Sequence, residues 1–198
     1  MPMKDNREYR SFAALQTHAP DEGEQGGAMV LEGYALTFDQ PYELSDGLYE
    51  VIDRHALDGA DLSDVIMQYD HQGAVLARLR NQTLALMADE HGLYVRADVS
   101  KSPRGRDLYE EVSNGLVDRM SFGFTVAEGG WDYDPATRTS TIRSISKVFD
   151  VSAVSMPANP NTEISARSYL NGVIEGERQE LSRRQQEARE RLALTLAL

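Results

Sequence analysis

Asp118-Arg-Met-Ser-Phe-Gly-Phe124 is the stretch of this chain that most clearly predicts a β-strand. Side chains along a strand alternate between the two faces of a sheet, so the methionine and both phenylalanines would share one face and pack in a core. Ser121 and Gly123 would lie on the other face, where the serine stays reachable and the glycine lets another backbone approach closely. The same alternation is typical of an ordinary half-buried strand, so this stretch alone does not indicate chemistry.

The composition is that of a globular domain, with 198 residues of which 41% are hydrophobic and 26% charged. No apolar run is long enough to span a membrane, and the polar N-terminus lacks an apolar export signal, so we expect a cytoplasmic protein that contacts no membrane. The absence of cysteine excludes a thiol nucleophile and fits a reducing compartment. The net charge of -12 argues against a nucleic-acid partner, which would need clustered Lys and Arg.

Many short segments have strand patterns, and one segment between them has a helix pattern. Strands are predicted at about 29–38, 49–53, 65–71, 84–87, 93–99, 140–145 and 147–154. Ser102-Pro103 is a typical helix start and Asn114-Gly115 a typical helix stop. This order predicts a mainly β fold of the α+β class, an antiparallel β-barrel or sandwich with flanking helices.

The chain is expected to have three parts. Residues 1–28 include the acidic, glycine-rich stretch Asp21–Gly27 and are predicted to be loosely ordered. Residues 29–170 would form the folded domain. Residues 171–198 are rich in Glu, Gln and Arg with only a thin apolar stripe, which predicts a charged helical tail.

Without cysteine, covalent catalysis would need a serine, threonine or lysine next to a base, and histidine is the usual base near neutral pH. Among the four histidines, His71 is the best placed because it closes the predicted strand 65–71, on the face that it would share with Val65 and Met67. Asp150 interrupts an apolar run, so its carboxylate must be paired or face water. Each position is also typical of a purely structural residue.

Other kinds of site are less well supported. Asp70-His71 and Asp89-Glu90-His91 contain metal-ligand residue types, but neighbours on a strand point to opposite faces, so we expect no metal. No pair of carboxylates has a spacing that indicates a glycosidase, although so acidic a chain leaves that class open. Neither standard glycine-rich phosphate loop is present, and we expect no cofactor.

Taken in order, the motifs of this chain resemble the prohead (procapsid) maturation proteases of tailed bacteriophages, which are relatives of the herpesvirus assemblin proteases. These motifs are Tyr49–Leu57, Tyr69-Asp-His71, Leu76-Ala-Arg78, Thr83–Leu86, Glu90-His-Gly-Leu93, Met120–Phe124 and Phe149–Pro160. The resemblance covers residues 29–168. Its most specific part is Ser-Phe-Gly-Phe followed downstream by Val-Ser and Pro-Ala-Asn-Pro.

The resemblance implies an antiparallel β-barrel of the herpesvirus-protease type and a serine endopeptidase without a cofactor, with residues 29–170 as the protease domain. The family's nucleophile falls on Ser121 and its general base on His71. In the herpesvirus relatives the third catalytic residue is a second histidine, but no histidine follows residue 91 here. An acidic residue just before the Val-Ser pair would replace it, which maps to Asp150.

The resemblance also implies the substrates, which would be the scaffold or the scaffold-like part of the major capsid protein, and the enzyme itself. Cleavage would take place inside the assembling procapsid in the bacterial host cytoplasm. Relatives are dimers or become active on assembly, so we expect a homodimer or an assembly-activated oligomer. Two other interpretations remain open: a non-catalytic capsid-assembly or scaffold module with the same barrel, and an acidic binding domain unrelated to phages.

Overall fold

A computed structural model describes residues 7–18, 28–45 and 47–155, together with residues 179, 182–184 and 186. The chain divides into two compact units, Met1–Thr162 and Glu163–Leu198. The described residues of the second unit are helical, and most of the predicted tail at 171–198 lies outside the described residues. All the elements named below belong to the first unit.

Short strands dominate the described part of the chain. In order, the elements are β1 (Glu8–His18), β2 (Val30–Thr37), β3 (Tyr42–Ser45), β4 (Leu48–Ile52), β5 (Ile66–Tyr69), β6 (Gln72–Arg78), the 3-10 turn η1 (Leu79–Asn81), β7 (Leu84–Ala88), β8 (Gly92–Asp98), α1 (Pro103–Ser113), β9 (Arg119–Val126), β10 (Trp131–Asp134), β11 (Thr139–Ile142) and β12 (Ile145–Val154). The predicted class, mainly β with few helices, is therefore confirmed.

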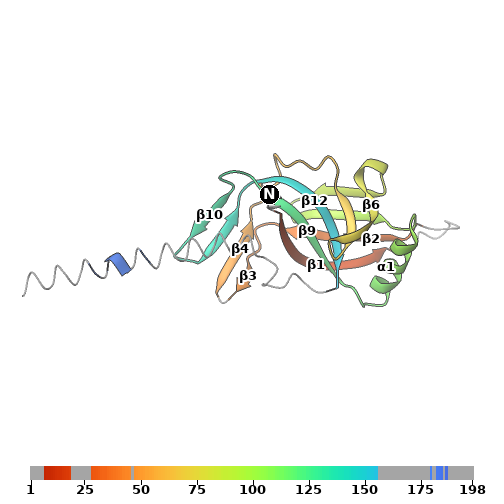
Figure 1. Cartoon of the computed structure of the whole chain (residues 1–198), viewed down its shortest axis with the longest axis horizontal. Coiled ribbons are helices and arrows are strands. Elements are labelled where there is room, and N and C mark those ends of the chain that lie inside the picture. Colours follow the sequence, from red (N-terminus) through yellow and green to blue (C-terminus); the bar gives the residue numbers. More distant parts are fainter. Residues whose placement is uncertain are drawn as a thin grey trace, which may run out of the picture. The chain divides into compact units, whose positions relative to one another are not determined.

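Eight strands form the larger sheet in the order β6-β5-β12-β9-β1-β2-β8-β7. Its neighbours are antiparallel except for the parallel pair β5 and β12. The smaller sheet has the order β10-β11-β4-β3. Figure 1 shows the smaller sheet at one end of the larger sheet and α1 at the other end. Strand β9, which contains the Ser-Phe-Gly-Phe motif, lies near the middle between β12 and β1.

The larger sheet is not closed into the predicted barrel, because no ladder joins its edge strands β6 and β7 in the described part of the chain. Backbone amides at the end of β6 donate to acceptors outside β7. The Arg78 amide donates to the Thr83 hydroxyl (2.9 Å), and the Leu79 amide donates to the Val65 carbonyl (3.0 Å). Gln82 then ends η1 in a left-handed conformation. The relation to the herpesvirus-type barrel stays a prediction.

The core face of β9 is the one that the sequence predicted. Met120, Phe122 and Phe124 are completely buried, and the two phenylalanine rings stack with their centroids 4.4 Å apart. The helix is also confirmed. Ser102 caps α1 by accepting a hydrogen bond from the Gly105 amide (2.9 Å).

The N-terminal segment differs from the prediction of a loosely ordered part. Residues 8–18 form β1, which pairs with β9 on one side and β2 on the other. Charged residues at positions 8 and 10 hide the strand pattern in the sequence. Both are buried, and Arg10 is neutralised by contacts with Glu8 and Glu50. A buried charge is tolerated in a central strand when it is paired in this way.

Candidate active site

His71 lies at the tip of the β5–β6 hairpin. Tyr69 pairs with Gln72, which leaves Asp70 and His71 as the two central residues of the turn. Both have positive φ values, 48° and 56°, as a type I′ turn requires. Aspartate and histidine are among the few residue types other than glycine that tolerate this region. The predicted strand 65–71 therefore ends early, and the expectation that His71 shares a face with Val65 and Met67 is wrong.

The turn aims the imidazole across β12 toward β9. His71 Nε2 lies 2.7 Å from Ser121 Oγ, and His71 Nδ1 lies 2.5 Å from Asp150 Oδ1. The histidine side chain is 17% exposed and the aspartate side chain 4%. The structure thus brings together the three residues singled out in the sequence, from a turn and two strands.

A β-bulge in β12 sets the direction of Asp150. Val148 pairs with Phe124 and Asp150 with Gly123, so two steps along β12 match one step along β9 and Phe149 is the extra residue. Val148 and Val151 both face the core, although alternation without a bulge would turn one of them away. The bulge therefore moves Asp150 onto the face that carries Ser121.

Gly123 makes room for the Asp150 carboxylate. A Cβ built on Gly123 would lie 2.4 Å from Asp150 Oδ2 and 2.8 Å from Tyr9 Cε1. The sequence predicted that a backbone would approach this glycine, but two side chains do so instead. The Tyr9 ring also packs against the His71 ring, with centroids 4.3 Å apart. Gly123 and Tyr9 thus border the imidazole–carboxylate pair.

Ser152 supplies a second donor to the carboxylate. Its hydroxyl donates to Asp150 Oδ1 (2.8 Å), the same oxygen that contacts His71, and Ser152 is completely buried opposite Ser121. Donors from two sides offset the cost of burying the carboxylate. The period of two along β12 could have identified Ser152 once Asp150 was chosen. Tyr9 had no such signal, because it lies in the segment predicted to be loosely ordered.

Ser121 itself is completely buried. The expectation that its hydroxyl stays reachable is therefore wrong for this conformation. Ser121 pairs with Ser11 of β1 on one side and Ser152 of β12 on the other, and the imidazole contacts its Oγ. A ligand can contact the hydroxyl only after the atoms above it move.

The other histidines lie apart from this cluster. His55 Nδ1 contacts the exposed Asp58 (3.1 Å), and the His91 ring packs edge-on against Tyr34. The side chain of His18 lies outside the described residues. Among the residues that the structure describes, no group of three or more His, Asp or Glu could hold a metal ion. Within those same residues no helix is long and apolar enough to cross a membrane.

This arrangement allows the proton of the Ser121 hydroxyl to move to His71. If Asp150 accepts the Nδ1 proton of His71, then Nε2 carries a lone pair and can accept the proton of the Ser121 hydroxyl. A serine beside a base that is itself oriented by a third group is the arrangement that activates a hydroxyl as a nucleophile. The distance to Ser121 is within the range for such hydrogen bonds, and the distance to Asp150 is shorter than that range.

Comparisons with known proteins found a related protein, a similar structure and a family profile. The chain is 29% identical over 164 residues to the prohead protease of Enterobacteria phage HK97, covering 82% of this chain and 69% of that protein. The structure of the bacteriophage T4 capsid assembly protease, gp21, matches with a TM-score of 0.46 at 11% identity, covering 75% of this chain and 96% of that one. A family profile described as "Caudovirus prohead serine protease" matches residues 14–173. The chain belongs to the caudovirus prohead serine protease family.

Proposed function

We propose that this chain is a serine endopeptidase of phage capsid maturation, with Ser121 as nucleophile, His71 as general base and Asp150 as the residue that orients the base. The observation that carries the proposal is the unbroken line of contacts from Ser121 Oγ to His71 Nε2 (2.7 Å) and from His71 Nδ1 to Asp150 Oδ1 (2.5 Å). Family membership supports the reaction class.

In the proposed acylation step, Ser121 Oγ attacks the carbonyl carbon of a peptide bond while its proton moves to His71 Nε2. A C–O bond forms and the carbonyl π electrons move onto the oxygen. Asp150 stabilises the imidazolium and holds its tautomer. When the tetrahedral intermediate collapses, the C–N bond breaks, the imidazolium gives its proton to the leaving amine, and an ester remains on Ser121.

In the proposed deacylation step, water takes the place of the leaving amine. It attacks the ester carbon while His71 Nε2 accepts one of its protons, and the C–O bond to Ser121 breaks. The proton returns to Ser121 Oγ, which restores the free enzyme. No redox partner or cofactor takes part in either step.

The burial of Ser121 supports control of this activity by assembly. A fully buried hydroxyl cannot meet a peptide carbonyl, so the conformation described here needs a local opening before it reacts. Contacts with other subunits could supply the free energy for that opening, which fits the expected homodimer or assembly-activated oligomer. We place this event inside the assembling procapsid, in the bacterial host cytoplasm.

The proposed substrates are the scaffold or the scaffold-like part of the major capsid protein, and the enzyme itself. The name of the similar phage HK97 protein, a prohead protease, supports substrates of this kind. We propose no metal, cofactor or nucleic-acid partner. We also propose that the fold is related to that of the herpesvirus proteases.

Co-expression with the capsid protein of the same phage tests the proposal. Ser121→Ala and His71→Ala should each lower the processing rate by about a thousandfold or more, because members of such a triad act as a unit. Asp150→Asn should have a smaller effect. Processing is measured on gels over time, and the intact mass of the protease reports self-cleavage.

Two matched variants serve as controls. Ser113→Ala removes a serine hydroxyl that bonds only within α1, and His55→Ala removes an exposed histidine. Both should process capsid protein at the wild-type rate. Unchanged processing by Ser121→Ala would refute the proposed function.

The alternative of a non-catalytic assembly module is favoured by one observation, the complete burial of Ser121. A fluorophosphonate probe separates the two functions. It should label wild-type protein in assembled procapsids and leave Ser121→Ala unlabelled. If the wild type is also unlabelled there and capsid protein stays intact, the chain is the assembly module.

A further inference from the structure

Asp70 connects the histidine turn to the end of β12. Its backbone amide donates to the Ala153 carbonyl (2.9 Å). Its carboxylate accepts from Ser155 twice, with Oδ1 2.9 Å from the amide nitrogen and Oδ2 2.9 Å from the hydroxyl. These three bonds hold the residue next to His71 against the strand that carries Asp150.

The turn needs such support because of its conformation. Asp70 and His71 both have positive φ, a region that costs free energy for any residue except glycine. The β5–β6 hairpin is an edge of the sheet, and β5 is only four residues long. An unsupported tip of this kind would sample other conformations, and each would carry the imidazole away from Ser121.

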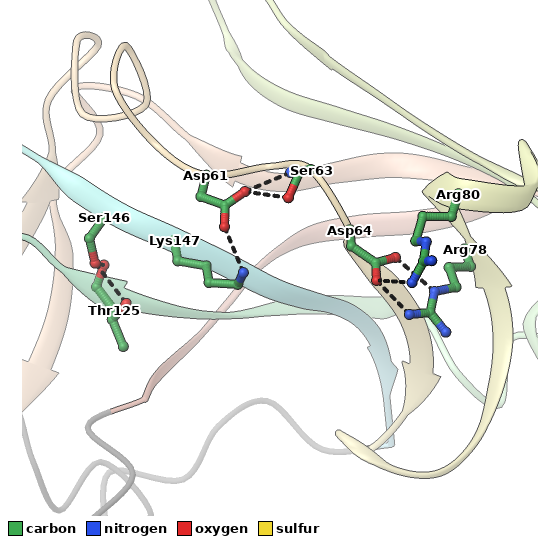
Figure 2. A network of polar contacts seen from close by, with 8 residues as sticks. All are labelled: Asp61, Ser63, Asp64, Arg78, Arg80, Thr125, Ser146 and Lys147. Carbon is green, nitrogen blue, oxygen red and sulfur yellow. Dashed lines mark hydrogen bonds and ion pairs between the residues drawn. The ribbon is translucent and has the colours of Figure 1, made fainter.

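The far end of the same hairpin is held separately. Arg78 of β6 contacts Asp64 just before β5 through two bonds, of 2.7 Å and 2.5 Å, and Arg80 adds a third at 3.3 Å. Figure 2 shows both arginines directed at the Asp64 carboxylate. The hairpin is therefore held by contacts of Asp64 at one end and of Asp70 at the other. Only Asp70 is adjacent to His71 in the chain.

Charges on α1 do not account for the position of Asp70. Arg104, Asp107 and Glu111 line a cavity of about 550 Å³ together with Asp70 and Tyr69. Within the described part of the chain, none of them forms an ion pair with Asp70. The Asp70 carboxylate is thus held by its hydrogen bonds with Ser155 and not by an ion pair with α1.

We propose that Asp70 is a positioning residue for His71, and that its contact with Ser155 keeps Nε2 within hydrogen-bond reach of Ser121. The inference rests on the proposed function. A general base must stay within about 3 Å of the atom whose proton it takes, and misplacement of a reacting group by about 1 Å can cost about a hundredfold in rate. Asp70 acts through the backbone of the turn and does not touch the reacting atoms.

The test measures fluorophosphonate labelling of full-length protein in assembled procapsids, with kinact and KI determined separately. Ser121 Oγ forms a bond to phosphorus, fluoride leaves, and the serine proton passes to His71. Asp70→Ala should lower kinact about 10- to 100-fold and leave KI within about twofold. Asp70→Asn should recover most of kinact, because asparagine accepts from the Ser155 amide and tolerates positive φ.

Two further variants sharpen the result. Ser155→Ala removes only the hydroxyl bond and should have a smaller effect, and the double variant with Asp70→Ala should be no slower than Asp70→Ala alone. Asp64→Ala is the matched control, since it releases the other end of the hairpin. It should lower the melting temperature and keep kinact. If Asp70→Ala keeps kinact within twofold, or changes only KI, the proposal is wrong.

An NMR measurement separates failure of this inference from failure of the proposed function. The imidazole Nδ1 proton of His71 should resonate far downfield in wild type, Ser121→Ala and Asp64→Ala, and should shift upfield or broaden in Asp70→Ala. An unchanged resonance in Asp70→Ala overturns the inference whether or not the protein is labelled. If Ser121→Ala is labelled at the wild-type rate, the proposed function fails, and this resonance still decides the role of Asp70.

Discussion

At the scale of single residues, position 123 has the least freedom in the site. A Cβ there would overlap Asp150 Oδ2 at 2.4 Å and Tyr9 Cε1 at 2.8 Å. Relief of this overlap requires the carboxylate to move, and the carboxylate is held by His71 and Ser152. The Asp150 carboxylate can therefore keep its position only if residue 123 has no side chain.

Gly123→Ala should accordingly lower the labelling rate of Ser121 by about a hundredfold, because a shifted carboxylate reorients the imidazole. The overlap should also destabilise the protein by about 1–3 kcal/mol. Labelling kinetics and urea unfolding measure the two effects. Gly59→Ala is the control, since no atom lies within 4 Å of a Cβ there, and it should change neither quantity. If Gly123→Ala were labelled at the wild-type rate, the absence of a side chain at position 123 would not be needed to place Asp150.

Individual residues differ in how far the sequence predicts their positions. The faces of β9 follow from alternation alone, and Met120, Phe122 and Phe124 lie where that pattern predicts. Ser121, His71 and Asp150 were singled out mainly through the family resemblance. The exposure of Ser121 could not be predicted, because it depends on strands distant in the sequence that flank β9 on both sides.

At the scale of elements, the ion pair between Arg78 and Asp64 at the far end of the β5–β6 hairpin makes the stability of the fold depend on pH. Arg78 hydrogen-bonds to Asp64 and lowers the pKa of this carboxyl from 3.8 to about 2. A folded-state pKa below the unfolded value means that the contact stabilises the fold above about pH 4. That stabilisation is lost as the pH falls through about 2. Figure 2 shows this ion pair beside the separate contact between Asp61 and Lys147.

Asp64→Asn should therefore be less stable than wild type at pH 7, and the difference should shrink as the pH falls from 4 toward the folded pKa of about 2. Urea unfolding at several pH values in this range measures the difference. Glu128→Gln, an exposed residue outside the ion pairs of the described chain, should give a difference near zero at each pH. A gap between Asp64→Asn and wild type that is the same at pH 7 and pH 2 would contradict this account.

Local signals identified the elements that depend on local chemistry. Ser102, Pro103 and Asn114 lie at the ends of α1 as the capping pattern predicts. Strand β1 was missed because the buried Arg10 resembles a surface residue until Glu50 is placed beside it, and Glu50 is 40 positions away in the chain. The type I′ turn at Asp70-His71 was missed because it lacks the usual glycine.

At the scale of the whole molecule, one buried ion pair joins the two sheets. Arg10 of β1 contacts Glu50 of β4 through two bonds, Nε–Oε1 at 2.5 Å and Nη2–Oε2 at 2.9 Å. The Tyr42 hydroxyl adds a bond of 2.6 Å to Glu50. Since Arg10 is next to Tyr9, which packs on the His71 ring, the smaller sheet supports the strand that borders the site.

Glu50→Gln should lower the free energy of unfolding by about 3 kcal/mol, because removal of one partner leaves a buried charge poorly compensated. Glu8, 3.3 Å from Arg10, keeps the loss at the lower end of the usual range. Arg54→Met breaks the pair between Arg54 and Asp39, whose side chains are 61% and 41% exposed, and should leave the free energy of unfolding nearly unchanged. Equal losses in the two variants, measured by urea unfolding, would show that burial does not set the strength of the Arg10 pair.

The sheet order was beyond sequence reasoning. Strand β9 lies between β1 and β12, and β5 pairs in parallel with β12, so the contacts that complete the site join segments about 80 residues apart. The alternation of apolar and polar residues predicts which side chains share a face of a strand, but it does not predict which strands lie beside it. The same limit explains why the sequence predicted a closed barrel, whereas no ladder joins the edge strands β6 and β7 in the described part of the chain.

The bulge at Phe149 determines which kinds of mutational change this region can accept. Because one surplus residue sets which side chains of β12 face the core, a strand that kept Phe149 but lost the bulge would turn Asp150 inward and Val151 outward together. Substitutions between Ile145 and Phe149 leave this facing intact, whereas one inserted residue that joins the ladder before Asp150 inverts it. Among descendants of this chain, insertions here should therefore be far rarer than substitutions.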